Sequence, residues 1–213
     1  AMIRPAAVQE PPDPEGGETA DPLPPVDVSE VEEVWHAISA PYGDLFAWLE
    51  GRTERPSTEA PGRFRPVMLA NPIDEASDFA KLDPADYAAE WKWDGIRVQA
   101  VREKGVCKLY SRTGEEIARA FPDLTADLHF EGAIDGELLV IREGQIAPFA
   151  DLQQRLNRKS ADARLMAAHP AGILAYDLLG HEGEDLRPLP LTERRARLAA
   201  LVAAHPSGRL QLS

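Results

Sequence analysis

The sequence predicts an α+β fold in which antiparallel sheets are flanked by helices. Four segments rich in β-branched and aromatic residues end in glycine or charged turns, which is the pattern of strands. They follow one another in hairpin-like succession, with helical patterns interspersed but no regular strand–helix alternation, and this favours α+β over a parallel α/β fold. The strands are expected at residues 90–101, 107–111, 134–141 and 172–179.

The length and composition are those of a globular protein. The chain has 213 residues, 44% of them hydrophobic and 28% charged, which suffices for one large or two small domains with a substantial core. No apolar run approaches the roughly 20 residues that span a bilayer, and the N-terminus lacks the apolar core of a signal peptide. The single Cys107 excludes an internal disulfide and a cysteine-based metal cluster. We therefore expect a cytoplasmic protein without a membrane partner.

Acidic residues are concentrated at the start of the chain. Residues 1–33 hold nine acids and one base, so they contribute −8 of the formal net charge of −13 and leave −5 on the other 180 residues. Phosphate binding depends on Lys and Arg, and the later part contains basic clusters, so the net charge neither supports nor excludes a nucleic-acid partner. Seven prolines and few large apolar residues predict that residues 1–28 are a disordered, acidic, proline-rich linker.

Residues 29–52 are expected to be helical. Ser29 and Glu32 form a capping-box pattern, and Pro41 ends the first helix. A second short amphipathic segment follows, and the polar, proline-containing residues 53–63 predict a connector. The apolar positions whose spacing defines the two helices are Val31, Val34, Trp35, Ile38, Tyr42, Leu45, Phe46, Trp48 and Leu49.

Three further helices are expected between and after the strands. Residues 147–157 and 160–169 have helical patterns, and Ser160 is the expected cap of the second. Residues 191–205 predict a surface helix, since one of its faces carries Leu198, Leu201 and Val202.

The segment Glu90-Trp-Lys92-Trp-Asp94-Gly95-Ile-Arg97 carries the most specific chemistry. Lysine at its reference pKa of roughly 10.4 is not a nucleophile near neutral pH. Apolar surroundings and a nearby fixed positive charge favour the neutral amine, and this segment offers two tryptophans and an arginine. Gly95 permits a tight turn and a close approach of a ligand to the backbone. Lys-x-Asp-Gly is also a common way to leave a strand, so the motif alone does not establish an active site.

Three later motifs occur in a fixed order after this segment. They are Tyr110-Ser-Arg112-Thr-Gly114-Glu115, then Asp135-Gly136-Glu137-Leu-Leu, then Tyr176-Asp177-Leu-Leu with Asp185-Leu-Arg187-Pro-Leu-Pro-Leu191 and the pair Arg194-Arg195. Together the four motifs resemble the adenylation domain of ATP-dependent DNA ligases, within the covalent nucleotidyltransferase superfamily. The segment 35–52 resembles the end of the DNA-binding domain that precedes the catalytic domain in bacterial and archaeal-type ligases.

The resemblance implies a reaction in three steps, carried out on nicked duplex DNA by a monomer associated with the nucleoid. Lys92 would attack the α-phosphate of ATP, expel pyrophosphate and hold AMP as a phosphoramidate. The adenylate would pass to the 5′-phosphate of a nick, and the 3′-hydroxyl would displace AMP. Negative charge builds on phosphate oxygens in these steps, so ATP and Mg²⁺ are the expected cofactors, with guanidinium groups nearby.

The resemblance also assigns roles at the nucleotide. Glu90 would accept the adenine amino group, and Tyr176 would stack on adenine, although a core aromatic in an apolar strand is nearly as natural for Tyr176. Glu137 would contact the ribose or coordinate Mg²⁺ through water. Each carboxylate could instead be an ordinary surface acid.

The resemblance also assigns residues that would contact the phosphates, the nick and the DNA backbone. Arg97 and Arg112 would contact nucleotide phosphates and ribose or the nick, with surface ion pairs as the alternative. Asp94 would organise the metal and the nick end in the later steps. Arg155 and Arg158 would contact the DNA backbone.

Several related activities share the lysine motif. NAD-dependent ligases typically lack an arginine two residues beyond the glycine and need zinc-binding cysteines, so Arg97 favours ATP. Five scattered histidines also suggest no zinc site. RNA ligases and capping-type enzymes remain alternatives, although residues 185–195 look more like DNA ligase. A non-catalytic nucleotide-binding remnant is the alternative from another functional class.

The family carries further motifs that this sequence does not contain. They are a second acidic strand motif and a Lys-x-Lys strand, followed by an oligonucleotide-binding domain. The chain stops at Ser213 before them, so we expect residues 64–213 to be a partial adenylation domain of a larger protein. The later lysines hold the triphosphate during adenylation, and the fragment is therefore expected to be poorly active by itself.

Overall fold

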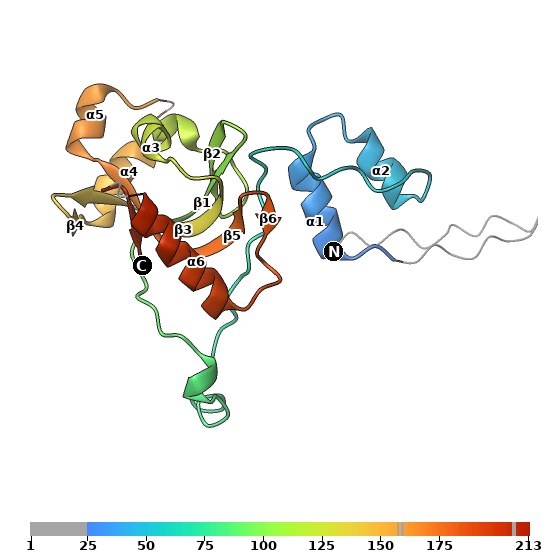
Figure 1. Ribbon diagram of the computed structural model, residues 1–213, viewed down its shortest axis with the longest axis horizontal. Coiled ribbons are helices and arrows are strands. Elements are labelled where there is room, and N and C mark those ends of the chain that lie inside the picture. The colour runs from blue at the N-terminus through green and yellow to red at the C-terminus, as the bar shows by residue number, and fades with distance from the viewer. Residues whose placement is uncertain (1–24, 157, 159, 206–207) are drawn as a thin grey trace, which may run out of the picture. The chain divides into compact units, whose positions relative to one another are not determined.

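The computed structural model describes residues 25–156, 158, 160–205 and 208–213 (Figure 1). The chain divides into two compact units, Ala1–Pro66 and Val67–Ser213. Most of the predicted linker, residues 1–24, lies outside the described residues. No helix in the described part of the chain is long and apolar enough to cross a membrane.

The first unit contains the two predicted helices, α1 (Val28–Ala37) and α2 (Gly43–Leu49). Its small core consists of Val31, Val34, Leu45 and Trp48. The predicted cap was wrong, because the side chain of Asp27, not that of Ser29, accepts from the first turn. The amide of Ser29 is the donor, at 2.7 Å. An Asx cap two residues earlier is equally effective for the free amides of a helix start.

The connector after α2 has no regular secondary structure over residues 53–60. Arg63 forms an ion pair with Glu33 at 2.6 Å, and the ring of Phe64 meets His36 edge-on with centroids 4.6 Å apart. Phe64, where we expected the second domain to begin, thus packs against α1. The boundary between the units falls after Pro66.

The second unit is built on a seven-stranded sheet within the described residues, with the order β2-β1-β3-β5-β6 and with β4 beside β3 and β7 beside β5. Every pairing is antiparallel except that of β5 with β7. The α+β prediction is confirmed. The strands are β1 (Ile96–Glu103), β2 (Val106–Ser111), β3 (Gly132–Arg142), β4 (Gln145–Ile146), β5 (Ala171–His181), β6 (Glu184–Asp185) and β7 (Leu210–Leu212).

Four α-helices and two short 3₁₀ turns accompany the sheet in the described part of the second unit. The helices are α3 (Pro122–Asp127), α4 (Phe149–Leu156), α5 (Ala163–Ala168) and α6 (Leu191–Ala204), and the 3₁₀ turns are η1 (Pro84–Asp86) and η2 (Ala118–Ala120). Figure 1 shows α6 beside β5. Helix α5 is capped by Asp162, whose side chain accepts from Leu165 N at 2.7 Å, and not by Ser160 as predicted.

The two faces of the sheet differ in chemistry. Val98, Ala100, Ile134 and Leu138 lie in the apolar core, together with leucines of α3, α4 and α6. The residues between them in β1 and β3 face the other way, because side chains alternate along a strand. Arg97 is paired with Glu137, and Gln99 with Asp135. One face of the central strands therefore buries the core, and the other presents the charged groups.

Two irregularities in this sheet shape the polar face. Asp135 pairs with Asp177 and Gly136 with Ala175, so Tyr176 is an extra residue at a β-bulge. A bulge re-aims a side chain that the regular alternation would direct elsewhere. The second irregularity is at the start of β1, which begins at Ile96 rather than at residue 90. Residues 90–93 are coil, since the register of β1 with β3 starts only at Ile96 opposite Leu138.

Candidate active site

The centre of the polar face is an ion pair between adjacent strands. Arg97 Nε donates to Asp135 Oδ1 at 3.1 Å, and Nη2 donates to Oδ2 at 2.5 Å. The Tyr176 hydroxyl donates to Asp135 Oδ1 at 3.4 Å, and the Arg97 guanidinium lies 5.9 Å from the centroid of the Tyr176 ring. Arg97 Nη1 also donates to the carbonyl oxygen of Met68 at 2.8 Å. Arg97 is thus held in one orientation by groups from three segments.

Burial controls the electrostatics of this cluster. It raises the pKa of Asp135 even though the bonds from Arg97 act in the opposite direction. It also raises the pKa of Tyr176, with the charge of Asp135 adding to the effect. Burial by itself would lower the pKa of Arg97, but the hydrogen bonds and charge of Asp135 outweigh it and raise that pKa. The cluster therefore keeps a fixed positive charge at Arg97.

Glu137 joins this cluster to the lysine segment. It is half-buried, and burial raises its pKa, while the amide of Gly95 and the charges of Lys92 and Arg97 act to lower it. Gly95 packs tightly against β3: a Cβ there would lie 2.5 Å from the carbonyl oxygen of Leu138 and 2.9 Å from Glu137 Cγ. Only glycine lets the coil approach β3 this closely, and the approach places Lys92 within electrostatic reach of Glu137.

Lys92 is exposed, contrary to the apolar surroundings that we expected from its two tryptophan neighbours. Trp91 is 79% exposed, whereas Trp93 is partly buried and its indole N–H donates to Ser213 Oγ at 3.0 Å. The rings are tilted, with centroids 6.3 Å apart. The coil conformation explains the difference, because a paired strand would have covered one side of this segment.

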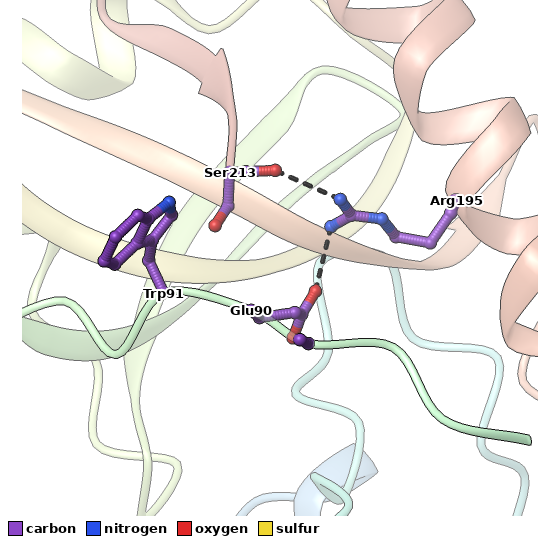
Figure 2. A pocket seen from close by; sticks show the side chains of 5 residues that line it. Glu90, Trp91, Arg195 and Ser213 are labelled. Atoms are coloured by element: carbon purple, nitrogen blue, oxygen red, sulfur yellow. Dashed lines mark hydrogen bonds and ion pairs between the residues drawn. The ribbon is translucent and has the colours of Figure 1, made fainter. Parts of the chain in front are cut away.

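A pocket of about 300 Å³ lies beside the coil and is lined by Ala89, Glu90, Trp91, Arg195 and Ser213 (Figure 2). Arg195 Nη1 donates to Glu90 Oε1 at 3.1 Å and to the carbonyl oxygen of Tyr176 at 3.1 Å, and Nη2 donates to the carbonyl oxygen of Ser213 at 3.0 Å. Arg195 therefore connects Glu90 to the backbone of Tyr176, and the nucleobase roles of both residues stay predictions. We predicted no separate role for Arg195 from the sequence. The adjacent pair Arg194-Arg195 was the available signal, since neighbouring helical residues point about 100° apart.

Asp94 and Arg112 lie outside the Arg97–Asp135 cluster. Asp94 is exposed in the bend before β1. Arg112 is exposed in the turn after β2, where Gly114 has a φ of 81° and its amide donates to the carbonyl of Ser111 at 3.0 Å. Over the described residues, no hydrogen bond or ion pair connects either side chain to the cluster. Both stay predictions for contacts with phosphate or with the nick.

The prediction that Arg155 contacts DNA is wrong. Its side chain is 0% exposed and donates to Asp123 Oδ1 at 2.5 Å, to the carbonyl of Ala120 at 2.7 Å and to that of His169 at 3.0 Å. A buried guanidinium that binds three protein groups cannot reach a DNA phosphate. Its partners lie far along the sequence, so a local basic cluster could not reveal them. Arg158 is exposed, and its DNA contact stays a prediction.

The available carboxylates, Glu137 and Asp94, match the small number of protein ligands that Mg²⁺ takes in phosphate-handling sites. The described residues contain no group of three or more His, Cys, Asp or Glu side chains that could hold a metal by themselves. Mg²⁺ in phosphate-handling sites usually takes one or two carboxylates and completes its shell with water and substrate phosphates. Glu137 and the exposed Asp94 are carboxylates of this kind, whereas Asp135 is engaged by Arg97.

Comparison with known proteins finds relatives along most of the chain. A probable DNA ligase of Koribacter versatilis is 38% identical over 141 residues, covering 63% of this chain and 24% of that protein. A DNA ligase of Pyrobaculum calidifontis is 34% identical over 160 residues, covering 72% and 27%. A probable DNA ligase of Streptomyces coelicolor is 33% identical over 199 residues, covering 83% and 38%. The chain thus spans less than half the length of each of these relatives.

A solved structure and a family model also match part of the chain. The ligase domain from M. tuberculosis LigD matches with a TM-score of 0.47 and 26% identity, over 58% of this chain and 38% of that one. The family model described as "ATP dependent DNA ligase domain" matches residues 67–213, which are the whole second unit. The resemblance drawn from the four motifs is confirmed. The chain belongs to the ATP-dependent DNA ligase domain family.

Proposed function

We propose that this chain is part of an ATP-dependent DNA ligase that seals nicks in duplex DNA and that Lys92 carries the AMP group. The observation that carries the proposal is the position of Lys92 within the ligase domain. It is exposed, on a coil that Gly95 holds against β3 beside Glu137 and the fixed cation Arg97. A nucleophile that must meet ATP and then a DNA end needs this accessibility.

In the first step, the neutral Lys92 Nζ attacks the α-phosphorus of ATP. The N–P bond forms as the bond between the α-phosphorus and the pyrophosphate oxygen breaks, and the amine loses a proton. The AMP group then passes to the 5′-phosphate of a nick, which releases Lys92. Finally the 3′-hydroxyl attacks that phosphate, and AMP leaves. Charge develops on phosphate oxygens in each step, and fixed cations stabilise it.

The surrounding residues take the roles that their positions allow. Glu90 and Tyr176 would bind adenine, and Arg97, held by Asp135, would supply a preorganised positive charge near the reacting phosphate. Mg²⁺, bound through Glu137 and the nucleotide phosphates, would add charge stabilisation there. The exposed Asp94 would act at the nick end in the later steps.

The DNA itself would be held by exposed cations. Arg112 and Arg158 are accessible and would contact the phosphate backbone of the nick or of the flanking duplex. The protein would act as a monomer on the DNA of the nucleoid.

The test is intact mass measurement after incubation of the full-length parent protein with ATP and Mg²⁺. We expect a gain of one AMP group in the wild type and none in Lys92→Ala or in the charge-preserving Lys92→Arg. A full-length protein that never gains AMP would refute the proposal and favour a non-catalytic nucleotide-binding module. A nicked duplex with DNA or RNA at the 3′ end then distinguishes DNA ligation from an RNA-directed activity.

A further inference from the structure

Arg195 joins three separate segments of the chain at the pocket of Figure 2. Through Glu90 it holds the coil before β1, through the Tyr176 carbonyl it holds the bulge of β5, and through the Ser213 carbonyl it holds the residue after β7. We propose that Arg195 is a positioning residue that makes the pocket select a purine with a 6-amino group over one with a 6-oxo group. The inference rests on the proposed function, in which Glu90 accepts a hydrogen bond from the nucleobase.

The contact between Arg195 and Glu90 uses one oxygen of the carboxylate. Nη1 meets Oε1 at 3.1 Å, and the Glu90 side chain remains 41% exposed at the pocket. A carboxylate has about four lone-pair sites on its two oxygens. Fixing Oε1 therefore orients the carboxylate and leaves Oε2 to accept from a ligand. Without this fixed partner, a glutamate on an exposed coil would sample many rotamers.

A fixed Glu90 carboxylate can distinguish purines by whether the group at position 6 donates or accepts a hydrogen bond. An ionised carboxylate only accepts hydrogen bonds. A 6-amino group donates and can satisfy it, whereas the 6-oxo group of inosine only accepts and would face the carboxylate oxygen unpaired. Hydrogen bonds to charged groups correspond to roughly 10- to 100-fold in affinity. The selectivity therefore depends on Glu90 being in place, and Arg195 places it.

The shape of the guanidinium suits this role better than a simple charge. Its planar fork donates to three oxygens from different segments, which the point charge of a lysine cannot do in the same way. The neighbouring arginines on α6 bind elsewhere: Arg194 binds Asp177 at 2.8 Å, and Arg197 binds Glu184 at 2.8 Å. Arg197 is thus a matched control on the same helix that does not line the pocket.

The experiment compares binding of AMP and IMP to the full 213-residue chain, by calorimetry and by tryptophan fluorescence, to which Trp91 at the pocket contributes. We expect the wild type to prefer AMP by at least about tenfold. Arg195→Ala should weaken AMP binding about tenfold and bring the AMP-to-IMP ratio close to one. Arg195→Lys should keep only part of the preference, and Arg197→Ala should keep all of it. Circular dichroism and thermal unfolding verify that each variant is folded.

The outcomes separate this inference from the proposed function. If Arg195→Ala or Arg195→Lys weakens AMP and IMP equally and leaves their ratio at the wild-type value, while Glu90→Ala abolishes the preference, the role of Arg195 is overturned and the pocket stands. If Glu90→Ala also keeps the wild-type ratio, the nucleobase site itself is wrong. If Arg195→Ala does not fold, the ratio measured in folded Arg195→Lys decides between these results.

Discussion

Replacing Gly95 by alanine should separate the rate of AMP attachment from the stability of the fold. The new methyl group would lie 2.5 Å from the Leu138 carbonyl oxygen and 2.7 Å from Leu139 Cδ2, where ordinary contact begins at 3.4 Å. A β-strand carbonyl in the middle of the sheet cannot retreat easily, so the exposed coil must move instead. The displacement needed to reach ordinary contact is on the order of 1 Å, and it carries Lys92 away from Glu137.

The size of the effect follows from that displacement. Overpacking of this kind costs about 1–3 kcal/mol when the surroundings must accommodate it. A misplacement of about 1 Å at a reacting group can lower a rate about 100-fold. We therefore expect Gly95→Ala to slow AMP attachment about 100-fold and to lower the free energy of unfolding by no more than ~3 kcal/mol.

Two measurements on the full-length protein are needed, the time course of AMP attachment by intact mass and urea unfolding followed by circular dichroism. Gly208→Ala is the matched control, because a Cβ at Gly208 meets nothing within 4 Å, and it should change neither quantity. A folded Gly95→Ala protein that attaches AMP within threefold of the wild-type rate would refute the argument that the close packing of Gly95 places Lys92.

Three further predictions concern the groups around the site and the core. Arg155→Met should lower the free energy of unfolding by about 3 kcal/mol, since it leaves the carboxylate of Asp123 to Arg209 alone, and it should not change the salt dependence of DNA binding. Arg158→Ala should keep the stability and reduce the slope of log affinity against log salt by about one. A change of slope in Arg155→Met would contradict the structure. Asp135→Asn should slow AMP attachment and cost about 3 kcal/mol of stability, because it removes the charge that holds Arg97; unaltered rates would show that Arg97 needs no such support. Burial raises the pKa of Tyr110 to about 12, so the folded state holds this proton more tightly than the unfolded state. The stabilisation present below pH 10 should therefore be lost between pH 10 and about 12. Urea unfolding across this range should show a smaller loss of unfolding free energy in Tyr110→Phe than in the wild type.

The strands and the ligase motifs could be predicted from sequence because both are local patterns. β3, β5 and α6 lie within a few residues of their predicted ranges, since apolar periodicity and glycine-containing turns mark them directly. Helix starts were less accurate, because Asp27 and Asp162 are as good caps as the serines nearby and only the three-dimensional turn selects between them. The start of β1 was wrong for a related reason: the alternating tryptophans of residues 90–95 resemble a strand, but the register with β3 begins only at Ile96.

The arginines show where local patterns fail. Arg155 belongs to a basic cluster in the sequence, yet its partner Asp123 lies on α3 and takes it into the interior. Arg195 belongs to a motif without an evident separate role, yet it meets Glu90, 105 positions earlier in the chain. The charge of a guanidinium is evident from the sequence, but its function depends on which oxygen it meets. The identity of that oxygen depends on contacts between segments far apart in the chain, and the spacing of residues along the sequence does not reveal it.

Contacts on both sides of Lys92 explain how an exposed lysine can have a fixed backbone position. The coil around Lys92 is fixed at three points: Glu90 by Arg195, Trp93 by the Ser213 hydroxyl, and Gly95 by its packing on β3. Lys92 lies between these points and is itself exposed. Its backbone position is therefore set by its neighbours, while its long side chain keeps the freedom that the proposed transfer from a nucleotide to a DNA end requires. Loss of any one anchor should then reduce the rate of AMP attachment more than it reduces the stability of the sheet, because the anchors bind a surface coil and the apolar core lies on the other face.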